Sequence, residues 1–138
     1  MSQPWLQHYP ENVSPTIDLP EGTHIASLIE DTCQKYSMKI ALTCMGADLT
    51  FRQFDRLAND FAAYLQNEAG LRKGDRFAIM LPNVMQFPIA LFAATKIGVV
   101  CVNTNPLYTS REMKHQFHDS GAKAIVILDM FLDKLEEI

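Results

Sequence analysis

Three asparagines follow apolar runs of this sequence, at places where polar side chains could meet a small ligand. Asn83 comes shortly after the run Phe77–Leu81, and Asn103 and Asn105 come after the run Val99–Val102. Two such runs joined by a helix form parallel strands, and ligands of open parallel sheets bind beyond the carboxyl ends of the strands. The three amides are therefore candidates to line a cofactor crevice. We favour the simpler interpretation that they are cap and turn formers.

Two predicted helices begin at the same edge of the sheet. Thr109 and Glu112 have the spacing of a capping box, in which each side chain bonds the backbone N–H of the other residue. Asn83 and Gln86 have the same spacing and predict a helix start at Asn83. Helix N-termini present free N–H groups and a partial positive charge, which would suit an anion here.

Glu112, His115 and His118 share one side of a predicted helix at a spacing that metal sites use. A di-iron centre needs the same pattern from a second helix and two further carboxylates. The other histidines, His8 and His24, have no further candidate ligands at such a spacing. We interpret the three residues as a solvated helix face and expect no metal site.

Patterns for nucleotide binding and nucleophilic catalysis are absent. None of the six glycines has the G-x-G-x-x-G or G-x-x-x-x-G-K-[ST] spacing that cradles phosphates. Nothing in the sequence orders a serine, a histidine and an aspartate in space. We predict that these 138 residues hold no catalytic residue and bind no cofactor on their own.

The elements that would position these residues form an α/β unit with a doubly wound, mostly parallel sheet. Three apolar runs predict buried strands at Phe77–Leu81, Val99–Val102 and Ala124–Leu128. Strands joined by helices of this length are parallel, with right-handed crossovers. Helices are predicted at His24–Tyr36, from Thr50 to before Gly70, from Asn83 to about Ile97, from Thr109 to near Gly121, and at Phe131–Ile138.

Two of the helices carry apolar residues at the spacing of a packing face, and a short hairpin is predicted between them. The hairpin pairs Ile40–Met45 with Asp48–Thr50 about a turn at Gly46–Ala47. The first helix should bury Ile25, Leu28, Ile29 and Cys33. The second has a continuous stripe, which we interpret as packing, of Phe51, Phe54, Leu57, Ala58, Phe61, Ala62 and Leu65.

Composition limits the classes of partner. The net charge of −4 and the lack of a basic cluster argue against nucleic acid. Cys33, Cys44 and Cys101 suggest neither disulfides nor a metal site, which fits a reducing cytoplasm. The longest apolar region, Phe87–Val102, is too short to span a membrane, and the first twenty residues do not have the pattern of a signal peptide. We expect a soluble chain.

The sequence divides into an arm at residues 1–22 and an α/β portion at residues 23–138. Four prolines keep the arm irregular, and Trp5, Leu6 and Tyr9 are the candidates to anchor it. At the other end, the last predicted helix stops in mid-pattern at Ile138 without a stop signal. We expect the 138 residues to be part of a longer protein.

Several of these segments together resemble the amino-terminal region of the adenylate-forming acyl-CoA synthetases. The phrase VNTNPLYTSREMKHQFHDSGAKAIV is most similar to the bacterial long-chain fatty acid–CoA ligases. The resemblance covers nearly the whole chain and rests on Leu49–Phe51 before the striped helix, Gly74–Asn83, Ala94-x-x-x-Gly98, and Val102–Thr109 with Arg111–Glu112.

The resemblance implies an enzyme that condenses a fatty acid with ATP to an acyl-adenylate, with Mg²⁺, and then transfers the acyl group to CoA. In that family the phosphate loop, the adenine contacts and the mobile domain lie beyond the part present here, so no catalytic residue is carried over. It also implies a cytoplasmic protein, with peripheral association at the inner face of the membrane. A scaffold piece of this kind should leave apolar surface uncovered and self-associate.

A second interpretation of the same fold is a stand-alone signalling or binding module of flavodoxin-like type. A phosphorylatable receiver would need an acidic residue where the central strand ends, but that strand ends with Leu81, Pro82 and Asn83. A flavin-binding module would need a Ser/Thr-rich phosphate loop, which is absent. Because one fold hosts many functions, the fold class alone does not decide between the two interpretations.

Overall fold

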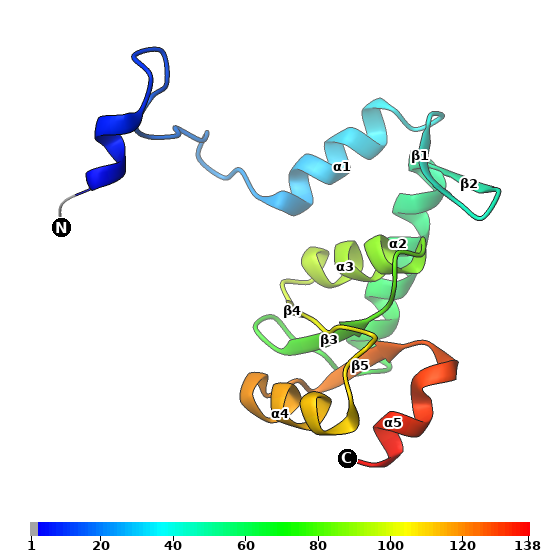
Figure 1. Cartoon of the computed structure of the whole chain (residues 1–138). Helices are drawn as coiled ribbons and strands as arrows, with labels where there is room; N and C mark the ends of the chain where they lie inside the picture. The colour runs from blue at the N-terminus through cyan, green and yellow to red at the C-terminus, as the bar shows by residue number, and fades with distance from the viewer. Residues whose placement is uncertain (1–2) are drawn as a thin grey trace.

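The computed structural model describes residues 3–138 and contains two separate sheets (Figure 1). An antiparallel hairpin pairs β1 (Ile40–Cys44) with β2 (Ala47–Thr50). A parallel three-stranded sheet has the order β4 (Val100–Asn103), β3 (Arg76–Met80), β5 (Ala124–Ile127). The predicted α/β class, with a mostly parallel sheet and a short hairpin before it, is confirmed.

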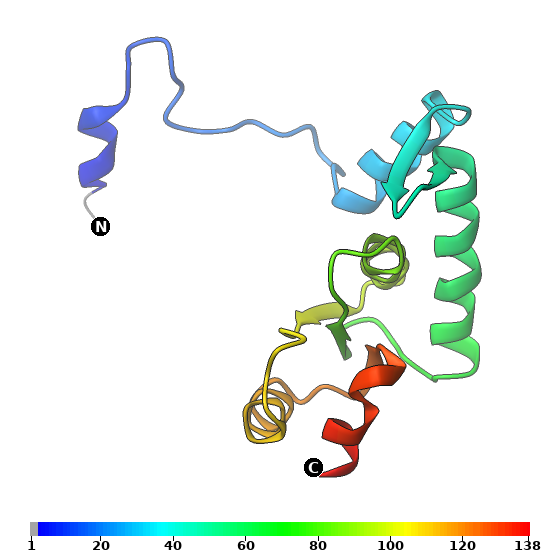
Figure 2. The same ribbon diagram turned by 45° about the vertical axis from the view of Figure 1, so that its right-hand side comes forward.

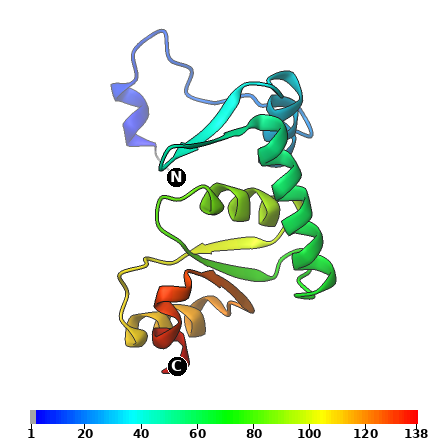
Figure 3. The same ribbon diagram turned by 90° about the vertical axis from the view of Figure 1, so that its right-hand side faces the viewer.

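Helices lie on both faces of the parallel sheet (Figure 2). On one face α3 (Gln86–Lys96) packs beside α2 (Phe51–Asn67), and on the other lies α4 (Ser110–Ser120). α1 (Ile25–Lys35) packs on α2 and α3, and α5 (Leu132–Glu136) follows β5 through a 3₁₀ turn. Figure 3 shows α2 running from the hairpin to the level of the sheet, so one helix ties the two sheets together.

Two apolar clusters hold these layers. The larger one lies between the sheet and the pair α2 and α3, and includes the fully buried Phe77, Ile79 and Leu65. The smaller one lies beneath α1 and the hairpin, where the rings of Phe54 and Phe92 stack at 5.5 Å. Burial of each large side chain of this kind contributes about 1.5–3 kcal/mol. The position of β3 at the centre of the sheet explains why its sequence is apolar on both faces.

The other two parallel strands are edge strands, and the prediction that they are buried was wrong. Each has β3 as its one strand neighbour in the sheet of the described residues. Val100 of β4 is 50% exposed, and every residue of β5 is only half-buried. The apolar face of α1 is also only partly covered, since Ile25 and Leu28 are exposed. A single-sequence pattern identifies an apolar strand but not the number of its neighbours.

The predicted capping of α3 by Asn83 was also wrong. α3 begins at Gln86, with Met85 at the N-cap and no side-chain cap bond. The reason is Pro88, which has no N–H and whose ring would collide with the carbonyl of Val84 in a helix that began one turn earlier. Starting at Gln86 places Pro88 in the first turn, where no donor is needed. The predicted end of this helix at Gly98 is confirmed.

The hairpin and the first residues differ in detail from their predictions. The turn lies at Met45–Gly46 instead of Gly46–Ala47, and both turn residues have positive φ, as a tight two-residue turn requires. Residues 3–24 contain the 3₁₀ helix Pro4–His8 and otherwise irregular chain with turns, which lies apart from the sheets (Figures 1 and 2). Trp5 and Tyr9 are exposed and do not anchor this arm. Residues 1 and 2 of the predicted arm lie outside the described residues.

Candidate functional site

The carboxyl edge of the parallel sheet lies beneath the hairpin and is apolar. Cys44, Met45 and Ala47 of the hairpin line one side of a groove of about 470 Å³. Leu81 after β3 and Leu128 after β5 line the other side. The position where doubly wound folds bind ligands therefore presents alkyl groups here, with Gln86 as the single polar lining residue.

The three candidate asparagines do not converge on this groove. Asn83 is exposed, and its carbonyl oxygen lies 3.9 Å from the Cys44 Sγ. The backbone carbonyl of Asn103 accepts a hydrogen bond of 3.1 Å from the Gln116 side chain. The side chain of Asn105 accepts one of 3.0 Å from the Leu107 N–H, which closes a turn. Each asparagine has a local contact, and none of the three lines the groove at the carboxyl edge.

The predicted anion site at the N-terminus of α4 is taken by the helix's own carboxylate. Thr109 and Glu112 form the predicted capping box, with the Glu112 Oε2 2.8 Å from both the Thr109 N and its Oγ1. The Thr109 backbone N–H, followed by its hydroxyl, holds the pKa of Glu112 below its ordinary value. The carboxylate is therefore charged at neutral pH and occupies the position that an external anion would take.

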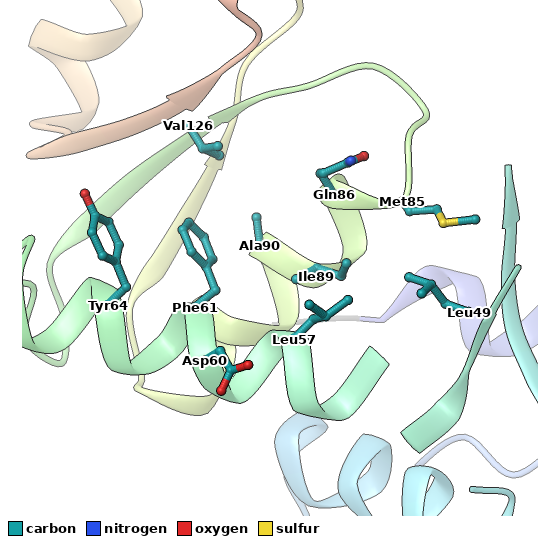
Figure 4. Close-up of a pocket in the computed structure, with 10 residues that line it drawn as sticks. All are labelled: Leu49, Leu57, Asp60, Phe61, Tyr64, Met85, Gln86, Ile89, Ala90 and Val126. Atoms are coloured by element: carbon teal, nitrogen blue, oxygen red, sulfur yellow. The ribbon is translucent and has the colours of Figure 1, made fainter. Parts of the chain in front are cut away.

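A second apolar groove of about 650 Å³ lies between α2, α3 and the edge strand β5 (Figure 4). Phe61 and Tyr64 project from α2 toward Val126 of β5, while Ile89 and Ala90 of α3 form the adjoining wall. Leu57 and Phe61 belong to the stripe that the sequence assigned to packing, yet both are only half-buried. No spacing of residues indicates this groove, because the groove depends on which strand lies under α2.

A polar cluster centred on Lys96 joins three helices, and Lys96 also lines an open pocket of about 790 Å³ together with His24 and Lys73. The Lys96 Nζ lies 2.8 Å from an oxygen of Asp55, 3.0 Å from one of Glu30 and 2.7 Å from the Asn59 amide oxygen. It also lies 4.6 Å from the centre of the Phe92 ring. These contacts fix α1 and α2 to α3, and with three oxygen partners the ammonium has no donor left for a substrate.

Residues 3–138 contain no cluster of three or more His, Cys, Asp or Glu side chains that could hold a metal ion. His115 lies on the surface of α4 with Arg111 and Asp119, and Glu112 beside it is engaged in its capping box. None of the helices in this part of the chain has the length and apolar character of a membrane span. The two grooves at the carboxyl edge and beside β5 therefore offer mainly apolar surface.

Sequence comparison places the chain in a known family. The family model described as AMP-binding enzyme matches residues 29–138. The long-chain-fatty-acid–CoA ligases of Yersinia pestis and Escherichia coli O157:H7 are 44% and 43% identical over 138 residues. Each match covers 100% of this chain and 25% of the relative. The chain thus spans about a quarter of the length of the curated relatives it matches.

Structure comparison finds the same fold in solved proteins. The anthranilate CoA ligase AuaEII, solved in complex with anthranoyl-AMP, superposes with a TM-score of 0.81 at 24% identity. That match covers 87% of this chain and 23% of AuaEII. The N-terminal subdomain of Klebsiella oxytoca NpsA, in complex with anthranilyl-AMSN, gives 0.72 at 27% identity over 76% of this chain and 27% of its own. No comparison favours a stand-alone flavodoxin-like module.

Proposed function

This chain belongs to the AMP-binding enzyme family, and from that premise we propose that it is a scaffold part of a long-chain fatty acid–CoA ligase. The whole protein would condense a fatty acid with ATP to an acyl-adenylate and diphosphate, and then form acyl-CoA and AMP. One observation carries this proposal: relatives named as such ligases, among them those of Yersinia pestis and Haemophilus influenzae, match all 138 residues at 41–44% identity, including residues 1–28, which the family model does not reach.

Within that enzyme, the role of these residues would be to support the site where the reaction occurs. Adenylate formation requires cations and N–H groups around the phosphates of ATP. The carboxyl edge offers alkyl groups, Lys96 is held by carboxylates, and the α4 N-terminus is taken by Glu112. We infer that the 138-residue chain alone is inactive and that its asparagines act as turn formers.

The finer assignments are part of the same proposal. ATP, Mg²⁺ and CoA would bind to the whole protein outside this stretch, together with the fatty acid. Residues 1–22 would be an arm, and residues 23–138 a portion of the large N-terminal domain. The protein would be cytoplasmic, with peripheral association at the inner face of the membrane where its substrate partitions.

Self-association of the chain is also proposed, because it exposes apolar surface. The groove of about 650 Å³ below Phe61 and Tyr64 is open, and Ile25, Leu28 and Val100 are exposed. Exposed apolar surface of this kind drives association in water. Dimers or larger assemblies of the 138-residue chain are expected in light scattering at high concentration.

A chimera tests the ligase assignment directly. This chain would replace the matching quarter of the Yersinia pestis ligase, and formation of acyl-CoA from a long-chain fatty acid would be measured. The chimera is expected to retain activity, because the replaced part is scaffold. A matched chimera with the corresponding residues of AuaEII controls for adenylating enzymes with other substrates. A folded chimera without activity toward any fatty acid would contradict the proposal.

A further inference from the structure

Four cations come together at the corner where α1 ends and where β1 and α2 begin (Figure 1). The Phe51 N–H donates a hydrogen bond of 3.0 Å to the Lys39 carbonyl, so the hairpin returns the chain to the end of α1. The Arg52 N–H donates one of 3.0 Å to the Ser37 carbonyl, and the Arg52 guanidinium contacts the Met38 sulfur. We call this surface the basic corner, and its cations are Lys35, Lys39, Arg52 and Arg56.

The cations of the basic corner are exposed and form no ion pair among residues 3–138, where the ion pairs all lie elsewhere. Two exposed carboxylates flank the corner, Asp31 one turn before Lys35 and Asp60 one turn after Arg56. A chain of net charge −4 therefore gathers four of its 12 lysines and arginines at one place. The sequence shows no basic cluster, because the two pairs of cations meet only after the hairpin has formed.

Exposed apolar side chains lie between these cations. Met38 is 69% exposed and Ile40 is 57% exposed. The Tyr36 ring lies beside them in sequence, with the ammonium groups of Lys35 and Lys39 at 5.3 and 4.8 Å from its centre. Cations that flank exposed aromatic and aliphatic groups are typical of protein surfaces that lie at a lipid–water interface. The composition of the corner thus fits a partner that offers both negative charge and apolar depth.

The charges of the corner also limit what can cover it. A further part of the same polypeptide would have to bury four cations, which is costly unless each one is paired. A lipid surface leaves the cations in the headgroup layer while their alkyl stems and neighbours reach deeper. Nucleic acid also offers phosphates, but its backbone gives Met38 and Ile40 no apolar environment. An anionic lipid surface therefore fits the corner best.

We propose that the basic corner docks on an anionic membrane surface, with its cations among the lipid phosphates and with Met38 and Ile40 at the boundary of the acyl chains. The inference rests on the peripheral association proposed above, and it adds the surface of the chain and the charge of the lipid. Each lysine or arginine close to an anionic lipid surface strengthens binding about five-fold.

Sedimentation of the 138-residue chain with lipid vesicles tests the electrostatic part. Vesicles of phosphatidylglycerol mixed with phosphatidylcholine should bind the chain more tightly than vesicles of pure phosphatidylcholine, and about 1 M salt should remove the difference. Lys39→Gln/Arg52→Gln removes two cations of the corner and should weaken binding about thirty-fold. The matched control Arg111→Gln/Lys114→Gln has the same net charge, changes the exposed surface of α4, and should weaken binding less than two-fold.

A second pair of variants tests the apolar part. Met38→Ser should weaken binding to the anionic vesicles about five-fold, because it loses part of the transfer of the side chain out of water. Met130→Ser changes a methionine that is 72% exposed outside the corner and should have no effect. A single-stranded oligonucleotide serves as a polyanion without an apolar layer, and it should bind more weakly than the anionic vesicles.

The outcomes separate the basic corner from the peripheral association on which it rests. Anionic vesicles that bind the two double variants equally well would overturn the role of the corner and leave peripheral association standing. A chain that binds neither kind of vesicle would overturn both. Tighter binding to the oligonucleotide, with no effect of Met38→Ser on either partner, would replace the lipid by nucleic acid. The ligase assignment is independent of these results, because the chimera tests it by acyl-CoA formation.

Discussion

Replacing Lys96 by methionine should weaken the attachment of α1 to the rest of the molecule. The substitution keeps the aliphatic stem over the Phe92 ring but removes the ammonium, whose partners are Glu30 on α1 and Asp55 and Asn59 on α2. The Lys96 side chain is only 10% exposed, so water does not replace these contacts in the native state.

The expected loss in free energy of unfolding is about 2 kcal/mol. Breaking a fully buried pair costs about 3–5 kcal/mol, and an exposed pair about 1 kcal/mol or less. Lys96 belongs to the first case, but Glu30 and Asp55 are 44% and 33% exposed and can regain water. Urea denaturation followed by circular dichroism measures the difference. Lys114→Met, on the exposed side of α4, is the matched control and should change stability by less than about 0.5 kcal/mol.

The pH dependence supplies an independent check. Burial alone would lower the pKa of Lys96, but its hydrogen bonds to Asp55 and Glu30 outweigh burial and raise that pKa. The stabilisation is therefore fully present below the unfolded pKa of about 10.4 and disappears as pH rises through the higher folded pKa. Lys96→Met should lack this alkaline loss. If it denatures at the same urea concentration as the unmodified chain, the cluster does not hold α1 and the reasoning is refuted.

Two further substitutions test other contacts. Gly121→Ala should cost about 2 kcal/mol, because residue 121 has φ +64° and its new Cβ would lie 2.7 Å from the Arg76 Nη2. The guanidinium cannot move aside freely, since its Nε donates a hydrogen bond of 2.9 Å to the Ser120 carbonyl. In Gly70→Ala, at φ +69°, the new Cβ would have no atom within 4 Å, so this substitution should cost only the backbone strain of the positive φ. Equal losses in free energy of unfolding for the two variants in urea denaturation would contradict this. Asp75→Asn should reduce the loss of stability in acid, because hydrogen bonds from Lys123 and then from the Arg72 N–H lower the pKa of Asp75. The stabilisation from the charged Asp75 is fully present above the unfolded pKa of about 3.9 and vanishes as pH falls through the lower folded pKa. An unchanged acid denaturation curve for Asp75→Asn would count against this reasoning.

Local signals predicted well wherever neighbours in sequence decide the structure. The capping box at Thr109 and the end of its helix at Gly121 depend on residues within one turn, and the structure has both. The helix start at Asn83 failed although its own signal was local, because Pro88 further along imposes a stronger steric constraint.

Features that depend on distant segments were not predictable from this one sequence. Lys96 meets Glu30 and Asp55 only after three helices have packed, and no spacing reveals that meeting. The order of the strands decides that β5 is an edge and that Val126 lines a groove. Apolar periodicity predicts that a residue avoids water, but it does not say which neighbour covers it.

The release of diphosphate by the 138-residue chain tests the central claim most directly. The purified chain would be incubated with ATP, Mg²⁺ and a long-chain fatty acid, with the Yersinia pestis ligase as positive control. We predict release no faster than in a blank without protein, because these residues support the reaction site and do not form it. Release that requires both ATP and the fatty acid and rises with the amount of chain would contradict the account.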